Sequence, residues 1–237
     1  SLSLNKETYI VVSGRNENVN RISERLASES MKVTGHEEDY NSIMVEEEEA
    51  LKHITPDSLL VLVDHHREIL TASKAVLEAI SKRIIVDHHR RAEDLIGDTV
   101  LLYLEPSSSS TSELLTELVG YFNDRLEITP AEATALYSGI VLDTKNFAVQ
   151  TGERTFEAAA LLRRSGADPN MVRLMFKDDM DVLKLRARLI AEAKTIEPGI
   201  AIALYKRAEK GAKATILAAQ VADTLINIEG IHVGVAI

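Results

Sequence analysis

The chain carries the same charged tetrapeptide twice, Asp64-His65-His66-Arg67 and Asp87-His88-His89-Arg90. Each copy directly follows a short apolar run, VLV before the first and IIV before the second. Carboxylate and imidazole groups together suit Mn²⁺, Zn²⁺ or Fe²⁺, and carboxylates that bridge two such ions are typical of phosphoesterases. A single aspartate or histidine is more simply explained as a helix cap or a hydrogen-bonded core residue, but the repetition favours a metal site.

A third acid, Asp143, follows another apolar run in the segment GIVLDTKNF. We group it with the two aspartates that end predicted strands. Pro130 opens the segment PAEATALYSGIVLD, and proline is favoured in the first turn of a helix. We therefore also expect a helix from Pro130 that delivers Asp143 at its end.

Short β-branched runs predict buried strands through the first two thirds of the chain. These runs are YIVV (9–12), LLVLV (59–63), RIIV (83–86) and TVLLYL (99–104). Segments with apolar residues at three- and four-residue spacing predict helices over 22–30, 73–80 and 111–122. The fold class is therefore α/β, a parallel sheet flanked by helices. In such a sheet ligands bind outside the carboxyl ends of the strands, so both Asp-His-His groups should converge on one crevice.

The last third of the chain predicts a different organisation. Residues 171–196 have the charged, amphipathic pattern of one long linker helix. A strand (199–205), a helix (214–227) and a strand (232–237) follow, which form a small and incomplete α/β unit. We expect three parts: a sheet domain over 1–170, a linker helix over 171–196 and a partial domain over 197–237. The acidic run from Glu46 to Glu49 should be a solvated helix start.

Composition limits the partners. The 237 residues carry a formal charge of -10 and no cysteine, which argues against nonspecific binding of long nucleic acids and excludes disulfides and thiolate zinc sites. No apolar run is long enough for a transmembrane helix, and a reducing, cytoplasmic setting is expected. Bound cations would supply the positive charge for a phosphate ester, so a nucleotide substrate should be short.

Several segments together resemble the DHH/DHHA1 phosphoesterases, and within them the membrane-anchored cyclic-di-AMP phosphodiesterases of Gram-positive bacteria. The similarity runs from about residue 55 to the end. Its segments are VDHH (86–89), LEPSSSSTSELLTELV (104–119), AEATALYSGIVLDTKNF (131–147), TGERTFEAAALLRRSGAD (151–168) and AAQVADTLINIEGI (218–231). The resemblance implies a metal-dependent phosphodiesterase with a DHH domain and a DHHA1-like substrate domain.

Site residues are carried over from the resemblance by motif. They are Asp64, His88 and Asp143 as Mn²⁺ ligands, Asp87, His89 and Arg90 in catalysis, and Ser109, Ser110, Thr111 and Arg154 at the substrate. The hydroxyl-rich turn before residue 111 lies at a predicted helix start, where backbone N–H groups favour an anion. Helix capping is the alternative role for the same hydroxyls.

Two departures from the family pattern weaken the expected catalysis. The first family motif supplies one histidine and two aspartates, and the aligned residues here are Gly14, Asn18 and Asn20. We therefore expect one bound ion rather than two. A Gly-rich GGGH motif of the family's C-terminal domain is also missing. The substrate is expected to be cyclic-di-AMP or a short linear dinucleotide, with a nucleotide-binding or regulatory module as the alternative. We expect the chain to be either the cytosolic part of a membrane-anchored protein or a free-standing relative, and we leave a homodimer as an alternative to a monomer.

Overall fold

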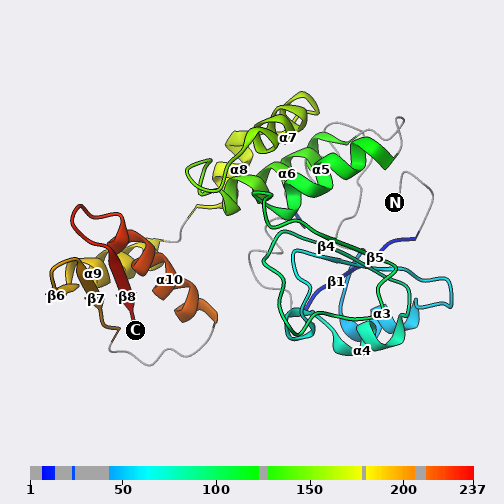
Figure 1. The fold of residues 1–237 in the computed structure, drawn as a ribbon, viewed down its shortest axis with the longest axis horizontal. Helices are drawn as coiled ribbons and strands as arrows, with labels where there is room; N and C mark the ends of the chain where they lie inside the picture. The colour runs from blue at the N-terminus through cyan, green and yellow to red at the C-terminus, as the bar shows by residue number, and fades with distance from the viewer. Residues whose placement is uncertain (1–6, 14–22, 25–42, 123–127, 178–179, 206–211) are drawn as a thin grey trace. The chain divides into compact units, whose positions relative to one another are not determined.

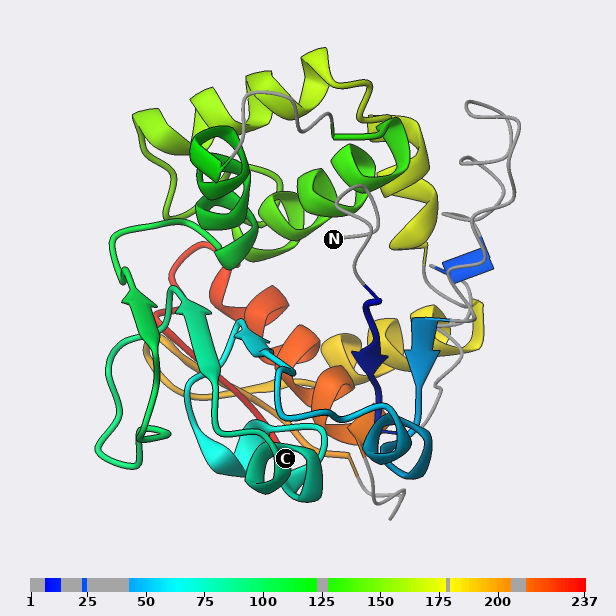
Figure 2. The same ribbon diagram turned by 90° about the vertical axis from the view of Figure 1, so that its right-hand side faces the viewer.

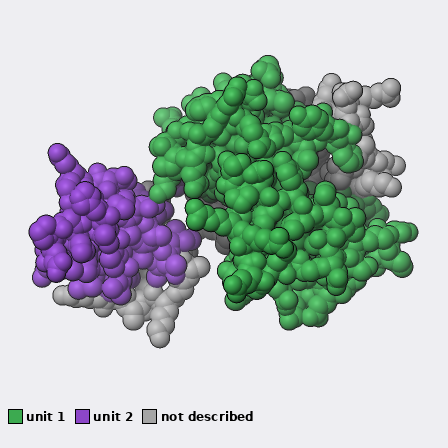
Figure 3. Space-filling view, in the orientation of Figure 1, with its two compact units in different colours: residues 1–175 green, residues 176–237 purple. Residues whose placement is uncertain are grey.

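The computed structural model describes residues 7–13, 23–24, 43–122, 128–177, 180–205 and 212–237 (Figure 1). The chain divides into two compact units, Ser1–Met175 and Phe176–Ile237 (Figure 3). The first unit contains both tetrapeptides. Among the described residues, no helix has the length and apolar character needed to cross a bilayer.

Parallel strands form the lower layer of the first unit. The strands are β1 (Ile10–Val11), β2 (Met44–Val45), β3 (Leu60–Val63), β4 (Arg83–Asp87) and β5 (Leu101–Leu104). β3, β4 and β5 lie side by side in that order, all parallel, and β1 pairs separately with β2 (Figure 2). The parallel α/β fold class predicted from the sequence is confirmed.

The register between β3 and β4 places the two tetrapeptides at the same level of the sheet. Leu60 pairs with Arg83 and Val63 pairs with Val86, an offset of 23 residues that equals the spacing of Asp64 and Asp87. Successive side chains of a strand point to opposite faces of the sheet. The apolar side chains on the inner face, including the fully buried Ile85, pack into a core that stabilises these strands. Both Asp-His-His groups therefore leave the sheet at its carboxyl edge.

Several helices of the first unit begin close to the predicted positions, namely α3 (Glu47–Lys52), α4 (Lys74–Ala79), α5 (Thr111–Phe122) and α6 (Pro130–Asp143). The helices α7 (Glu153–Arg164) and α8 (Pro169–Met175) were not predicted, nor was a short 3-10 turn at Glu68–Leu70. Ser73 caps α4 through the backbone N–H of Val76, and Thr129 caps α6 in a capping box with Glu132. The acidic run is the exposed first turn of α3, as predicted. The helix expected over 22–30 lies outside the described residues except for Ser23 and Glu24.

Helices α5, α6 and α7 pack on one another above the strands (Figure 1). Buried residues of α6 and α7, including Ile140 and Leu162, form their common core. Gly139 of α6 approaches Ser112 of α5 so closely that a β-carbon would lie 2.1 Å from the Ser112 hydroxyl oxygen. A side chain at position 139 would therefore displace the Ser112 hydroxyl and tighten the contact between α5 and α6.

The prediction of one linker helix over 171–196 is wrong. The segment contains the end of α8, a separate helix α9 (Met180–Ala191) and a strand, β6 (Lys194–Glu197). Aspartate disfavours a helix interior and favours the first turn, where Asp181 lies in α9. The β-branched pair Thr195 and Ile196 favours a strand, which the helical spacing of the earlier residues concealed.

The second unit extends the predicted strand–helix–strand. It contains β7 (Ile200–Ala203), α10 (Ala212–Ile226) and β8 (Val233–Ala236). β7 pairs antiparallel with β6 and parallel with β8. Leu189 of α9 joins Val221 and Leu225 of α10 in a core of its own. The strand β6 and the helix α9 thus belong to the small unit.

Candidate metal centre

Asp64 leaves the end of β3 in an unusual backbone conformation. Its N–H still donates to the carbonyl of Val86 at 3.0 Å, but its φ is +65°, in the left-handed region that aspartate tolerates better than most residues. The side chain is 57% exposed, and its Oδ1 accepts a hydrogen bond of 2.9 Å from the Thr111 hydroxyl. One oxygen of the carboxylate is therefore held by Thr111, while the side chain stays exposed at the carboxyl edge of the sheet.

His88 directly follows β4 and lies between two carboxylates. Its Nδ1 lies 3.4 Å from the carbonyl oxygen of Ser108. Its Nε2 lies 3.6 Å from Oδ1 of Asp64 and 3.8 Å from Oδ2 of Asp143. Two donors bound to one ion at about 2.1 Å can be at most about 4.2 Å apart. His88 is therefore close enough to share an ion with either of the two carboxylates.

Asp143 reaches the cluster from the last position of α6. The expected helix is confirmed, and the grouping of Asp143 with aspartates at strand ends is wrong. Burial raises the pKa of its carboxyl, and the neighbouring carboxylate of Asp64 raises it further, against smaller opposing effects of His88 and His89. A cation bound beside Asp143 would offset the charge of Asp64 and stabilise the ionised Asp143 carboxyl.

A buried carboxylate, that of Asp87, joins two histidines behind this cluster. Asp87 is fully buried; its Oδ2 lies 2.5 Å from Nδ1 of His66, and its Oδ1 lies 2.7 Å from Nδ1 of His89. The backbone N–H of Ala92 donates to Nε2 of His66, so Nδ1 of His66 carries the proton that faces Asp87. Burial alone would raise the pKa of Asp87, but the hydrogen bonds from the two histidines together hold it below its usual value.

The hydrogen bonds of Asp87 separate two of the predicted catalytic residues into a buried one and an exposed one. Asp87 is sealed from solvent and holds His89, which is 54% exposed. With Nδ1 bound to Asp87, His89 keeps Nε2 for another partner, the arrangement of a metal-binding or proton-donating imidazole. Ligand atoms of Asp64, His88 and His89 all lie within 4.8 Å of one another. The structure therefore brings His89 into the group of candidate metal ligands.

The hydroxyl-rich turn is buried and turned toward Glu113. The hydroxyl of Ser108 donates to Oε1 of Glu113 at 2.8 Å, and that of Ser109 donates to Oε2 at 2.5 Å. The Ser110 hydroxyl accepts from the Glu113 backbone N–H, which is the capping role considered for this turn. Two members of the turn contact candidate metal ligands: the Thr111 hydroxyl donates to Asp64, and the Ser108 carbonyl faces Nδ1 of His88. Substrate contacts of Ser109, Ser110 and Thr111 stay a prediction.

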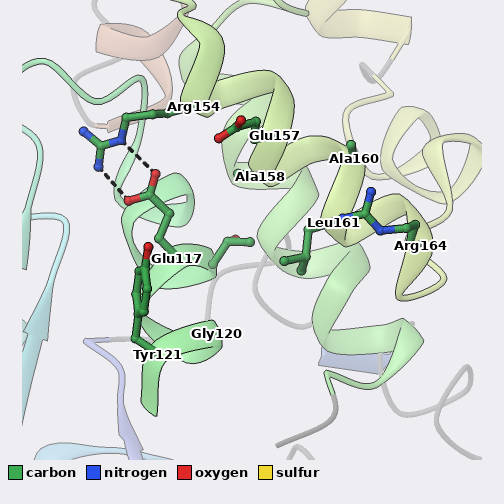
Figure 4. Close-up of a pocket in the computed structure, with 10 residues that line it drawn as sticks. Glu117, Gly120, Tyr121, Arg154, Glu157, Ala158, Ala160, Leu161 and Arg164 are labelled. Carbon is green, nitrogen blue, oxygen red and sulfur yellow. Dashed lines mark hydrogen bonds and ion pairs between the residues drawn. The ribbon is translucent and has the colours of Figure 1, made fainter. Parts of the chain in front are cut away.

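Arg154 lies in the first turn of α7 and is paired with a carboxylate. Its Nε and Nη2 donate to the two oxygens of Glu117 on α5, at 2.8 and 2.6 Å (Figure 4). This hydrogen-bonded pair, with a smaller effect of Tyr103, raises the pKa of Arg154 above its already high value. The two residues line a surface pocket between α5 and α7, and a phosphate at Arg154 would have to share the guanidinium with Glu117.

The arginines of the two tetrapeptides differ in their partners. Arg67 donates from Nε to both oxygens of Asp94, at 2.8 and 2.9 Å. Arg90 is exposed and makes no hydrogen bond or ion pair with any residue that the structure describes. Of these two cations, Arg90 is thus the one available to a phosphate.

Comparison with known proteins places this arrangement in a family. The DHH family, N-terminal domain, matches residues 9–140, more than half of the chain. The chain belongs to the DHH family. Cyclic-di-AMP phosphodiesterase PdeA of Listeria monocytogenes serotype 1/2a (strain 10403S) is 45% identical over 183 residues, 77% of this chain and 28% of PdeA. Cyclic-di-AMP phosphodiesterase GdpP of Bacillus subtilis (strain 168) is 38% identical over 233 residues, 98% of this chain and 34% of GdpP.

A solved structure shares the fold of this DHH chain. An exopolyphosphatase-related protein from Bacteroides fragilis superposes with a TM-score of 0.74 at 14% identity, over 97% of this chain and 66% of that chain. At this identity the likeness concerns the fold alone. The chain spans about a third of the length of PdeA and GdpP, or less.

The DHH site differs from the sequence prediction in two respects: one predicted part lies outside the described residues, and one residue of the site was not predicted. Gly14, Asn18 and Asn20, aligned with the first family motif, lie outside the described residues. His66 was not predicted as a site residue, although it lies in the first tetrapeptide. The strand spacing could have indicated it. Asp64 and Asp87 lie at the same level of neighbouring strands, and His66 follows Asp64 by two residues.

Proposed function

We propose that this DHH chain is a metal-dependent phosphodiesterase that uses Mn²⁺ and hydrolyses cyclic-di-AMP or short linear dinucleotides. The observation that carries the proposal is the position of His88, whose Nε2 lies between carboxylate oxygens of Asp64 and Asp143. Two carboxylates and an imidazole at these separations are a donor set that suits Mn²⁺.

The residues present fit one ion. Asp64, His88 and Asp143 would hold it, because Nε2 of His88 lies 3.6 Å from Oδ1 of Asp64 and 3.8 Å from Oδ2 of Asp143. Mn²⁺ bound there supplies positive charge and Lewis acidity to the phosphoryl group. Gly14, Asn18 and Asn20 bring no carboxylate or imidazole to a second site.

His89 and Arg90 would act on the substrate. The exposed His89 imidazole, held at Nδ1 by Asp87, would donate a hydrogen bond or a proton from Nε2 to a phosphate oxygen or to the leaving oxygen. Burial alone would lower the pKa of His89, but the hydrogen bond to Asp87 and the charges of Asp87, Asp64 and Asp143 raise it overall. The raised pKa favours the donor form. Arg90 would neutralise a non-bridging phosphate oxygen.

The charge of the chain sets the size of the substrate. A net charge of -10 repels a long polyanion, whereas a dinucleotide can be held by one ion and a few cationic side chains. The names of PdeA and GdpP support cyclic-di-AMP as the substrate class. We further place the chain in the cytosol, as part of a longer, membrane-anchored protein.

A second candidate function is nucleotide binding without turnover. Asparagine is a neutral oxygen donor and glycine offers no side-chain ligand, so Gly14, Asn18 and Asn20 favour an incomplete catalytic centre. Arg90 and the exposed His89 would still recognise a phosphate. The chain would then be a sensor or a regulatory module.

The test measures hydrolysis and binding on the same protein. Cyclic-di-AMP is incubated with the chain at high enzyme concentration and excess Mn²⁺, and products are separated by chromatography. Hydrolysis that requires Mn²⁺ and is lost in His88→Ala supports the enzyme. Calorimetric binding of cyclic-di-AMP without product supports the binding module, and absence of both results contradicts the two functions together. Arg67→Ala serves as the control variant, because the Arg67 guanidinium is already paired with Asp94.

A further inference from the structure

Glu113 is a buried acid that contacts neither a metal ligand nor solvent. It lies in the first turn of α5, and its side chain is 1% exposed. No ion pair joins it to a cation among the residues that the structure describes. A buried carboxylate is costly unless hydrogen bonds compensate for the lost water.

Hydroxyl and backbone groups provide that compensation. Ser108 and Ser109 donate through their hydroxyls, and the backbone N–H of Ser109 donates to Oε2 at 3.3 Å. Thr155, in the first turn of α7, contributes a further hydrogen bond. In an ordinary capping box the glutamate would return to the N–H of the cap residue Ser110. Here the Glu113 carboxylate instead accepts from the backbone N–H of Ser109, one residue earlier in the chain. Its hydrogen bonds thus hold the residues of the turn together.

The turn that Glu113 closes contacts the metal ligands at two points. The Ser108 carbonyl faces Nδ1 of His88, which directs Nε2 of the same ring toward Asp64 and Asp143. The Thr111 hydroxyl donates to Asp64 itself. Hydrogen-bonding groups behind the ligands fix the ring tautomer and orientation, and their loss typically weakens metal binding about 10- to 100-fold.

We propose that Glu113 is a positioning residue of the metal centre: its carboxylate fixes the Ser108–Thr111 turn so that the Ser108 carbonyl and the Thr111 hydroxyl orient His88 and Asp64. The inference rests on the proposed metal-dependent function. A purely structural Glu113 would instead affect the stability of the unit and leave the ligands as they are.

The test compares Glu113→Gln with Thr134→Val. Glutamine keeps the size of the side chain but replaces one acceptor oxygen with a donor, so the two serine hydroxyls can no longer both donate to it. Thr134 is similarly buried; it donates to the Pro130 carbonyl and accepts from the Asp168 N–H, away from the turn. Mn²⁺ affinity is measured by calorimetry on the metal-free chain, and the thermal midpoint is measured for each variant.

Glu113→Gln is expected to weaken Mn²⁺ binding about 10-fold or more, whereas Thr134→Val lowers the thermal midpoint and leaves the Mn²⁺ affinity within about 2-fold. An unchanged Mn²⁺ affinity in Glu113→Gln overturns the proposal. If Glu113→Gln does not fold, Ser108→Ala replaces it, since that variant removes one hydrogen bond to Glu113 and keeps the Ser108 carbonyl. A smaller loss of Mn²⁺ affinity is expected there, and none would equally overturn the proposal.

A second readout does not need the metal. The imidazole tautomers are observed by nitrogen-15 NMR at a pH of about 8.5, where ordinary histidines are neutral. His88 is expected to carry its proton on Nδ1 in the unmodified chain and to become a mixture of tautomers in Glu113→Gln. If the unmodified chain binds no Mn²⁺, the proposed function fails, and the His88 tautomer still decides the role of Glu113: an unchanged tautomer overturns it.

Discussion

Nδ1 of His66 lies 2.5 Å from Oδ2 of Asp87, and both side chains are buried. The two residues come from different copies of the same tetrapeptide. Asp87→Asn should therefore disrupt both copies, because an amide cannot accept from His66 and His89 with both of its polar atoms. We expect a loss of about 3 kcal/mol in the free energy of unfolding and a strong loss of hydrolysis. Urea denaturation and a cyclic-di-AMP assay measure the two effects.

Asp94→Asn is the matched control for that variant. Asp94 pairs with Arg67, another residue of the first tetrapeptide, but both side chains are largely exposed. Exposed ion pairs contribute little to stability. The control should therefore unfold at nearly the same urea concentration as the unmodified chain, and a loss as large as that of Asp87→Asn would contradict the role given to burial.

The two arginines of the tetrapeptides offer a second matched pair. Arg90→Ala should raise KM for cyclic-di-AMP about 10-fold, because the exposed Arg90 is available to a phosphate and a charged hydrogen bond is lost. Arg67→Ala should leave KM within about 2-fold, because Asp94 already occupies its guanidinium. Steady-state kinetics at constant ionic strength measure both. Equal effects of the two variants would mean that Arg90 acts only through net charge.

Metal stoichiometry tests the first-motif substitutions. We expect at most one tightly bound Mn²⁺ per chain, because Gly14, Asn18 and Asn20 cannot offset the repulsion between two dications. The triple variant Gly14→His, Asn18→Asp and Asn20→Asp should raise the stoichiometry toward two and increase any hydrolytic rate. Elemental analysis after gel filtration gives the numbers, and two equivalents in the unmodified chain would refute the alignment with the first motif.

Glu113 also predicts a pH dependence of stability. Burial alone would raise its pKa, but hydrogen bonds from Ser109, Thr155 and Ser108 hold the pKa below the ordinary value of 4.5. A carboxyl with a lowered pKa in the folded state stabilises it above pH 4.5, and this contribution is lost as the pH falls through the folded-state pKa. At pH 7 the free energy of unfolding of the unmodified chain should exceed that of Glu113→Gln by about 2 kcal/mol. This difference in stability should shrink below pH 4.5. Urea unfolding at a series of pH values measures the difference, and a constant difference would contradict the ionised state.

The sequence predicted most of the elements that carry the site. Alternating or continuous apolar runs located β3 and β4, helical spacing located α5 over the observed residues Thr111–Phe122, and Pro130 located the start of α6. These signals are local, since each depends on residues within one element. The prediction for 171–196 failed because it used the same local signal. The helical pattern was extended into Thr195 and Ile196, but these residues form a strand that is stabilised by pairing with β7, a contact between elements.

The candidate site was less predictable, because it depends on contacts between elements. Asp64 and Asp87 have the same neighbours in sequence, yet Asp64 is exposed with a positive φ and Asp87 is buried in the ladder. The serines of the turn suggested an anion site, and their hydroxyls are instead occupied by Glu113. That glutamate resembles any other acid in the first turn of a helix until the packing of α5 against α7 buries it.

The register of β3 with β4 also limits where the chain can change its length. One residue inserted within β4 would turn Ile85 toward the opposite face and shift Asp87 by about 3.3 Å relative to Asp64. One residue inserted at Thr71 or Ala72, between the 3-10 turn and the cap of α4, leaves every pair of the ladder intact. Insertions and deletions are therefore compatible with the site in this crossover, where the number of residues between the two tetrapeptides can vary while their level on the sheet stays the same.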